Sequence, residues 1–116
     1  MSNPFIDTAI VFNDDGLGRA DEALRHKLAV NYLRTLAELA HHPRAVLFYA
    51  AGVKLVAAGS PCLKELKELA DAGVPLIACR TCLEYYGLVD KVEVGEIGNM
   101  PRIVEMQGQA RKVVTV

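Results

Sequence analysis

A continuous apolar run, Ala45-Val46-Leu47-Phe48-Tyr49-Ala50, constrains the fold more than any other stretch of this chain. The run has the length of one strand, and polar residues do not alternate with apolar ones along it. Strands of this kind are covered on both faces, which is the arrangement found in parallel sheets. The run therefore predicts a central strand of a parallel sheet.

The remaining segments alternate between strand and helix patterns. Strand patterns occupy residues 6–12, 74–79 and 112–116, and residues 88–97 fit an exposed loop or a short edge strand. Helix patterns run from about residue 20 to 43, from Ser60-Pro61 to Gly73, from the end of the strand at 79 to Gly87, and onward from Asn99 and Pro101. Residues 53–58 fit a short helix or a loop. This order predicts a three-layer α/β fold, with a mainly parallel sheet of about five strands and helices on both faces.

Apolar spacing predicts the core-facing side of two helices. In the long first helix, apolar residues recur at steps of four and three, at Leu24, Leu28, Tyr32, Leu36 and Leu39. In the short helix that ends at Gly87, we expect Leu83, Tyr85 and Tyr86 to face the core.

Length and charge limit the classes of protein to which the chain can belong. With 116 residues it has room for one core, so a single domain over residues 1–116 is expected. The net charge of −1 gives no reason to expect nucleic-acid binding. The longest apolar stretch is about half of a membrane span, and the first residues lack a secretory signal. We therefore expect a cytoplasmic protein with no membrane partner.

The three cysteines and three histidines do not form a disulfide framework or a metal site. Three is an odd number and few for a disulfide scaffold, so reduced thiols are expected. Cys62 is interpreted as a small packing residue, although it also lies near the start of a helix. His26, His41 and His42 show no metal-ligand spacing, and no metal is predicted.

The loop after the first strand contains Gly16-Leu17-Gly18, which suggests a dinucleotide site only at first sight. Asp21 occupies the position of the third glycine of that fingerprint, and the sequence has no phosphate-binding loop. No nucleotide or other cofactor is therefore predicted. Asn13, Asp14 and Asp15 could border a site at the carboxyl end of the sheet, but ordinary turn chemistry is favoured.

The strongest chemical signal is Cys79-Arg80-Thr81-Cys82. Cys79 ends a predicted strand, and Cys82 falls in the first turn of the next helix, where the positive end of the helix favours a thiolate. Arg80 adds a nearby positive charge that could stabilise a thiolate or a persulfide. A functional thiol pair is favoured over two structural cysteines around a turn.

The pair admits two chemistries. In dithiol exchange, Cys82 would resolve a disulfide formed on Cys79; in sulfur relay, Cys79 would carry a sulfur atom as a persulfide and pass it to another thiol. A thioredoxin-type pair usually lies early in a chain, whereas this pair follows a third βα unit.

Four stretches resemble the DsrE-like domain of the DsrE/DsrF-like sulfur relay family, which includes TusD-like proteins. They are Phe48-Tyr49-Ala50-Ala51-Gly52-Val53-Lys54-Leu55, Gly59-Ser60-Pro61, residues 76–88 around the cysteines, and Gly95-Glu96-Ile97-Gly98-Asn99-Met100. The version at the carboxyl end of YedF, the sulfurtransferase-like selenium metabolism protein, is the most similar. The resemblance covers nearly the whole chain.

The resemblance implies a DsrE-like α/β fold, cytoplasmic sulfur handling and assembly into homo-oligomers such as trimers or hexamers. It places the sulfur carrier at Cys79 and gives Cys82 an assisting or resolving role. Beside the resemblance, the residues around the pair and at the end of the first strand give Arg80, Thr81 and Asn13 as candidate substrate-binding residues. YedF proteins also carry a TusA-like domain, so here a donor or acceptor of that type would be a separate protein.

The resulting hypothesis is a sulfurtransferase-like relay protein that carries sulfane sulfur on Cys79 and passes it to a protein thiol. Two alternatives are open: a non-catalytic oligomeric binding or regulatory module, whose cysteines bind a metal or pack, and a Cys-x-x-Cys dithiol oxidoreductase.

Overall fold

The computed structural model describes residues 5–116, and residues 1–4 of the predicted domain lie outside this range. Its strands form one parallel sheet in the spatial order β4-β3-β2-β1-β5. The strands are β1 (Thr8–Phe12), β2 (Ala45–Phe48), β3 (Leu76–Cys79), β4 (Glu96–Gly98) and β5 (Lys112–Thr115). The predicted α/β class is confirmed, and the sheet is parallel throughout.

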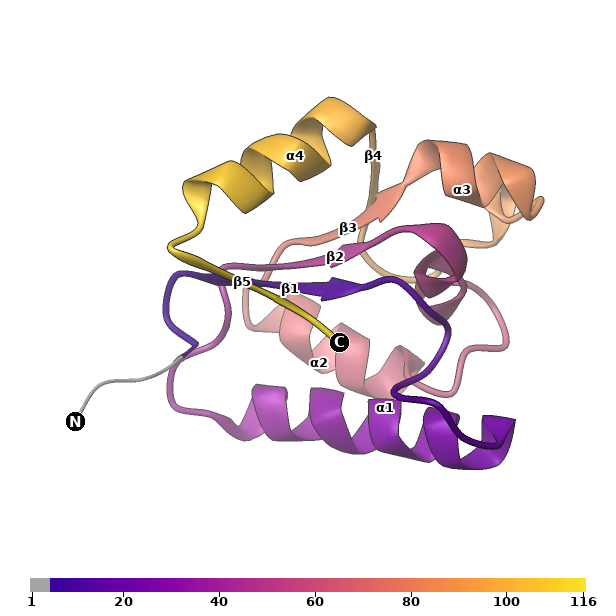
Figure 1. The fold of residues 1–116 in the computed structure, drawn as a ribbon, viewed down its shortest axis with the longest axis horizontal. Helices are drawn as coiled ribbons and strands as arrows, with labels where there is room; N and C mark the ends of the chain where they lie inside the picture. The colour runs from indigo at the N-terminus through magenta and orange to yellow at the C-terminus, as the bar shows by residue number, and fades with distance from the viewer. Residues whose placement is uncertain (1–4) are drawn as a thin grey trace.

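The helices cover both faces of the sheet (Figure 1). Helices α1 (Glu22–Glu38) and α2 (Leu63–Asp71) pack against each other on one face, and α4 (Met100–Gln109) covers the other. The α4 connection leads from β4 at one edge of the sheet to β5 at the other. The short helix α3 (Arg80–Tyr85) and two 3₁₀ helices, η1 (Ala50–Val56) and η2 (Val89–Lys91), complete the structure.

The core is centred on the three middle strands. Every residue of β1, β2 and β3 is buried, as the continuous apolar pattern of β2 predicts. Phe12 and Phe48 stack between β1 and β2 with ring centroids 5.7 Å apart. No helix within residues 5–116 is both long enough and apolar enough to cross a bilayer.

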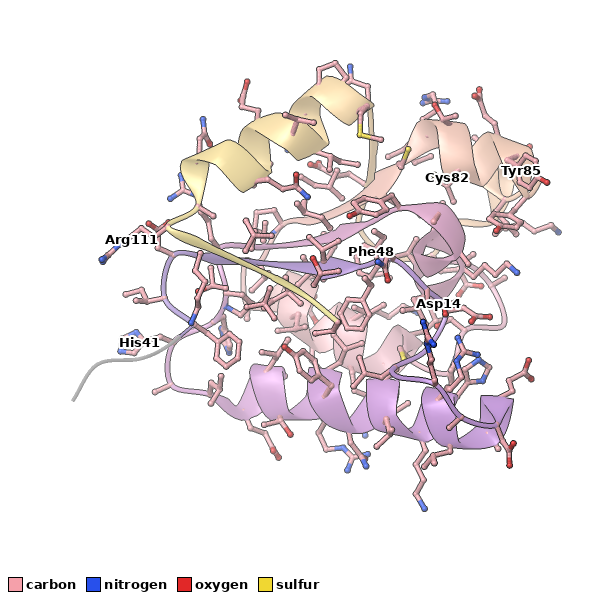
Figure 2. All side chains as sticks on the ribbon, in the orientation of Figure 1. Asp14, His41, Phe48, Cys82, Tyr85 and Arg111 are labelled. Atoms are coloured by element: carbon pink, nitrogen blue, oxygen red, sulfur yellow. The ribbon has the colours of Figure 1, made fainter. Side chains whose placement is uncertain are left out.

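Two predicted core faces are partly wrong. The buried residues of α1 are Ala29, Leu33 and Leu36, whereas Leu24 and Leu28 are 48% and 37% exposed. The helix rests on the sheet and α2 through a stripe adjacent to the predicted one, and small Ala29 lies in that contact. In α3, Leu83 is buried as expected, but Tyr85 at the end of the helix and Tyr86 just after it are 83% and 37% exposed, so neither faces the core (Figure 2).

Helix boundaries follow the predicted signals with small shifts. The side chain of Asn99 caps α4 by accepting a hydrogen bond from the Arg102 amide at 3.0 Å, which confirms the predicted cap. The α2 helix begins at Leu63 instead of Ser60-Pro61, and the Ser60 hydroxyl accepts a hydrogen bond from the Cys62 amide in the preceding turn. The ambiguous residues 53–58 fall mostly within η1.

Gly52 allows η1 to lie directly on the end of β1. A Cβ atom at this position would lie 2.7 Å from the carbonyl carbon of Phe12 and closer still to its oxygen. The same Phe12 carbonyl accepts a hydrogen bond from the Tyr49 amide at 3.2 Å. The main chains of β1 and η1 are therefore too close for any side chain at residue 52.

Replacing Gly52 by Ala is expected to lower the free energy of unfolding by about 2 kcal/mol, because the clashing atoms belong to the main chain and must shift. Urea denaturation followed by circular dichroism measures this change. Gly108→Ala is the matched control, since nothing lies within 4 Å of its added methyl group and alanine favours the α4 helix. Equal losses in the two variants would contradict the steric explanation.

Candidate functional site: a thiol pair at the carboxyl edge of the sheet

The carboxyl ends of parallel strands bring three segments to one edge of the sheet. The loop that follows β1, the 3₁₀ helix η1 after β2, and α3 after β3 all start at this edge (Figure 1). Ligands of open α/β sheets bind at such edges, because the loops there are free to diverge. Cys79 is the last residue of β3, and Cys82 lies in the first turn of α3, as the sequence predicts.

The two thiols of the pair differ in exposure. Only 1% of Cys79 is exposed, whereas Cys82 is half-buried and reaches the surface. The two cysteines lie on either side of the turn from β3 into α3, and both are free thiols. The structure therefore brings the predicted pair together with one thiol inside the core and one at its boundary.

A main-chain amide from the neighbouring strand connection contacts the more exposed thiol. The Ala50 amide donates a hydrogen bond to Cys82 Sγ at 3.1 Å. Ala50 has φ +51°, in the left-handed region that residues with a side chain rarely adopt. Strained backbone of this kind occurs often at functional sites, where the surrounding structure holds it in place.

The surroundings of Cys82 favour its protonated form. Burial raises the pKa of Cys82 above its ordinary value, and the hydrogen bond with Cys79 raises that pKa further. The Ala50 amide lowers the same pKa, but by less than these two effects together. The sequence-based expectation that the start of the helix favours a thiolate is therefore wrong for Cys82 in the resting protein.

The other predicted site residues lie on the surface at the same edge of the sheet. Arg80 and Thr81 are exposed in the first turn of α3. Asn13 is exposed at the start of the loop after β1, a strand separated from β3 by β2. Their predicted substrate-binding roles stay predictions.

Cys62 is a packing residue, as interpreted from the sequence. It is fully buried, and burial raises the pKa of its thiol to about 12, with a smaller contribution from the charge of Glu65. A thiol in this state is a poor nucleophile at neutral pH.

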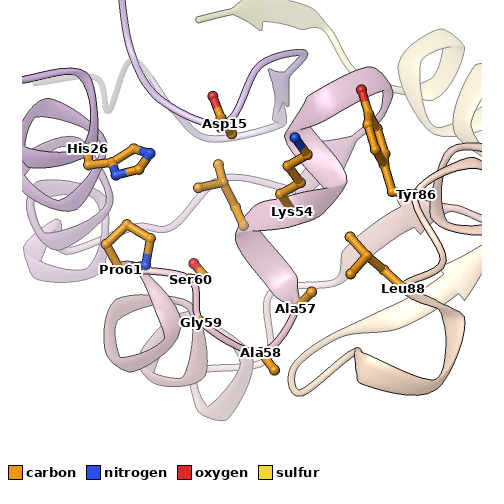
Figure 3. A pocket seen from close by; sticks show the side chains of 11 residues that line it. Asp15, His26, Lys54, Ala57, Ala58, Gly59, Ser60, Pro61, Tyr86 and Leu88 are labelled. Atoms are coloured by element: carbon orange, nitrogen blue, oxygen red, sulfur yellow. The ribbon is translucent and has the colours of Figure 1, made fainter. Parts of the chain in front are cut away.

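A cleft of about 430 Å³ opens beside η1 at the same edge of the sheet. Figure 3 shows His26 on one side, Tyr86 on the other, and Lys54 between them. The ammonium group of Lys54 lies 4.5 Å from the centre of the Tyr86 ring, an attractive cation–π geometry. Sequence reasoning missed this cleft, although Lys54 breaks an apolar stretch and Tyr86 follows Cys82 by one helical turn.

The acidic side chains of the loop after β1 form ion pairs with Arg25. The guanidinium of Arg25 lies 2.6 Å from Asp15 and 3.1 Å from Asp14. The hydrogen bond from Arg25 lowers the pKa of Asp15. This pairing agrees with the structural interpretation of the loop. Within residues 5–116, no three His, Cys, Asp or Glu side chains are grouped closely enough to hold a metal ion.

The fold and the site define a small α/β protein with a thiol pair at the carboxyl edge of a five-stranded parallel sheet. The model of the DsrE/DsrF-like family matches residues 6–116, so the chain belongs to that family. No curated protein sequence is similar enough to this chain to be counted as a relative.

Solved structures share the fold at low sequence identity. The ychN protein from E. coli is 17% identical, with a TM-score of 0.65 over 94% of this chain and 98% of that one. A protein of unknown function from Methanobacterium thermoautotrophicum is 20% identical, with a TM-score of 0.65 over 94% and 97% of the two chains. A conserved protein of unknown function from Bacteroides thetaiotaomicron is 17% identical, with a TM-score of 0.63 over 95% of each chain.

Replacing Cys79 by Ala is expected to lower the pKa of Cys82, because the hydrogen bond that helps to raise it is lost. More of Cys82 is then thiolate at pH 7, so its alkylation is faster and its pH–rate profile shifts to lower pH. Iodoacetamide labelling of Cys82 across a pH series, read by peptide mass spectrometry, measures this shift. Cys62→Ala is the control and should leave the profile in place; an unchanged profile in Cys79→Ala would contradict the explanation.

Proposed function

We propose that this protein is a sulfur relay protein of the sulfurtransferase type, which carries sulfane sulfur as a persulfide on the Cys79–Cys82 pair and passes it to a protein thiol. The observation that carries the proposal is the pair itself: two free thiols three residues apart at the carboxyl edge of the sheet, one of them within reach of solvent. Membership of the DsrE/DsrF-like family supports it.

The transfer is a balanced exchange between sulfur atoms. A cysteine thiolate attacks the outer sulfur of a donor persulfide, so that a new S–S bond forms on the protein and the donor's S–S bond breaks. The donor leaves as a thiolate and takes up the proton that the protein thiol lost. An acceptor thiolate then repeats the same step on the protein persulfide. No net oxidation occurs in either direction, and no cofactor is needed.

The proposal includes the partners implied by the resemblance to YedF-like and TusD-like proteins. The donor or acceptor is a separate small protein of the TusA type, in a cytoplasmic compartment that keeps thiols reduced. Assembly into a homo-oligomer such as a trimer or hexamer is supported by exposed apolar side chains one turn apart on α4, Met100 and Val104. Sedimentation equilibrium gives the number of subunits.

Dithiol exchange is the second candidate function, and the spacing of two free cysteines across one turn favours it. A dithiol oxidoreductase would form a reversible Cys79–Cys82 disulfide with oxidised glutathione and would carry little persulfide. A non-catalytic module would do neither.

Incubating the reduced protein with a sulfane donor is expected to add one sulfur atom per chain, because one thiol of the pair, Cys82, reaches the surface, whereas Cys62 is fully buried. Intact-mass spectrometry before and after treatment with dithiothreitol, which removes persulfide sulfur, measures the gain. The double variant Cys79→Ser/Cys82→Ser should show no gain, whereas Cys62→Ala should load like the natural protein. Sulfur that persists in the double variant, or its absence from the natural protein, would refute sulfur carriage by this pair.

A further inference from the structure

We infer that Cys82 is the thiol that receives sulfur from one partner and gives it to the next, that the Ala50 main-chain amide holds its sulfur in position, and that Cys79 is an internal resolving thiol. This inference rests on the proposed function and assigns its steps to individual atoms. It departs from the family resemblance, which places the carried sulfur on Cys79.

The two cysteines differ in how accessible their thiols are to a protein partner. Exchange requires the attacking sulfur, the attacked sulfur and the leaving sulfur to lie close to one line, so a protein partner must reach the thiol itself. Cys79 is 1% exposed and ends a strand that is hydrogen-bonded on both sides, to β2 and β4. Cys82 reaches the surface at the side of α3 (Figure 2). A partner thiol can therefore meet Cys82 without any opening of the sheet.

The Ala50 amide is aimed at the atom that becomes charged. Its N–H donates to Cys82 Sγ at 3.1 Å, and the exposed Ala50 residue adopts φ +51° to make this contact. Hydrogen bonds to anions are about twice as strong as those to neutral groups. The contact therefore stabilises Cys82 more as a thiolate, during exchange, than as the resting thiol.

Cys79 can resolve a persulfide on Cys82 that no acceptor thiol has taken up. Its thiolate can attack Cys82 Sγ, so that a Cys79–Cys82 bond forms and the bond to the outer sulfur breaks. The outer sulfur leaves as hydrosulfide, having gained the two electrons that the two cysteines lose. A dithiol reductant such as dithiothreitol then reopens the disulfide. The placement of the two cysteines on either side of the turn from β3 into α3 provides the starting geometry for this step.

The experiment is a time course of the reduced full-length protein with glutathione persulfide, quenched with iodoacetamide at short times. Peptide mass spectrometry locates the added sulfur. In the natural protein we expect it on Cys82. In Cys79→Ala we expect faster loading, and a persulfide that outlasts that of the natural protein because no internal thiol expels hydrosulfide. In Cys82→Ser we expect no loading beyond that of the double variant.

The outcomes separate this inference from the proposed function. Sulfur on Cys79 in the natural protein, or loading retained by Cys82→Ser and lost by Cys79→Ala, overturns the inference and leaves the proposed function standing. Sulfur on neither cysteine overturns both. The mapping in the natural protein decides the question even if a variant fails to fold.

The Ala50 amide is tested by a pair of substitutions at an exposed position. Ala50→Val disfavours the left-handed backbone, so the amide turns away from Cys82 and loading slows by about tenfold, the factor for one lost hydrogen bond to a charged group. Ala50→Gly adopts φ +51° without strain and should load faster than Ala50→Val, with the pH profile of Cys82 alkylation at lower pH. Equal loading rates and equal pH profiles of Cys82 alkylation in the two variants would show that the Ala50 amide has no role in the site.

Discussion

The close contact between η1 and the end of β1 is the constraint on which the carboxyl edge of the sheet depends. Gly52 lies against the Phe12 carbonyl group, and the Tyr49 amide donates to the same oxygen. This contact fixes where η1 lies relative to the end of β1. It therefore also fixes the position of Ala50, the first residue of η1. The environment of Cys82 on α3 is therefore set in part by β1, two strands away from the strand that carries the cysteine pair.

The left-handed Ala50 is the local cost of this arrangement. A residue with a side chain in this conformation is destabilised by about 1–2 kcal/mol relative to the right-handed one. The fully buried strands β1, β2 and β3 supply far more stabilisation than that, because each buries all of its side chains. A rigid core at the middle of the sheet thus supports an unfavourable backbone conformation at its edge, where the amide of Ala50 contacts a thiol.

Sequence patterns predicted the elements whose signals are local. The continuous apolar strand at residues 45–48, the Asn99 cap and the strand-to-helix position of Cys79 and Cys82 need only neighbouring residues to define them. The buried stripe of α1 was misplaced because Leu24 and Leu28 match Leu33 and Leu36 in polarity, and only the packing against the sheet distinguishes them. The pKa of Cys82 was misjudged because it depends on burial by η1 and on the Cys79 thiol, which only the fold brings together.

In the proposed sulfur exchange, the raised pKa of Cys82 and the amide that donates to its sulfur suit different stages of the reaction. Burial and the Cys79 contact keep the resting thiol protonated, which protects it from oxidation and from unselective attack on disulfides. The amide hydrogen bond counts most once the sulfur is an anion, and an interaction that strengthens as charge develops lowers the barrier more than it stabilises the resting state. A partner that brings its own proton acceptor to the surface of α3 would therefore activate Cys82 only within the docked complex. Selectivity for the correct partner would then follow from the same burial that makes Cys82 of the isolated protein react slowly.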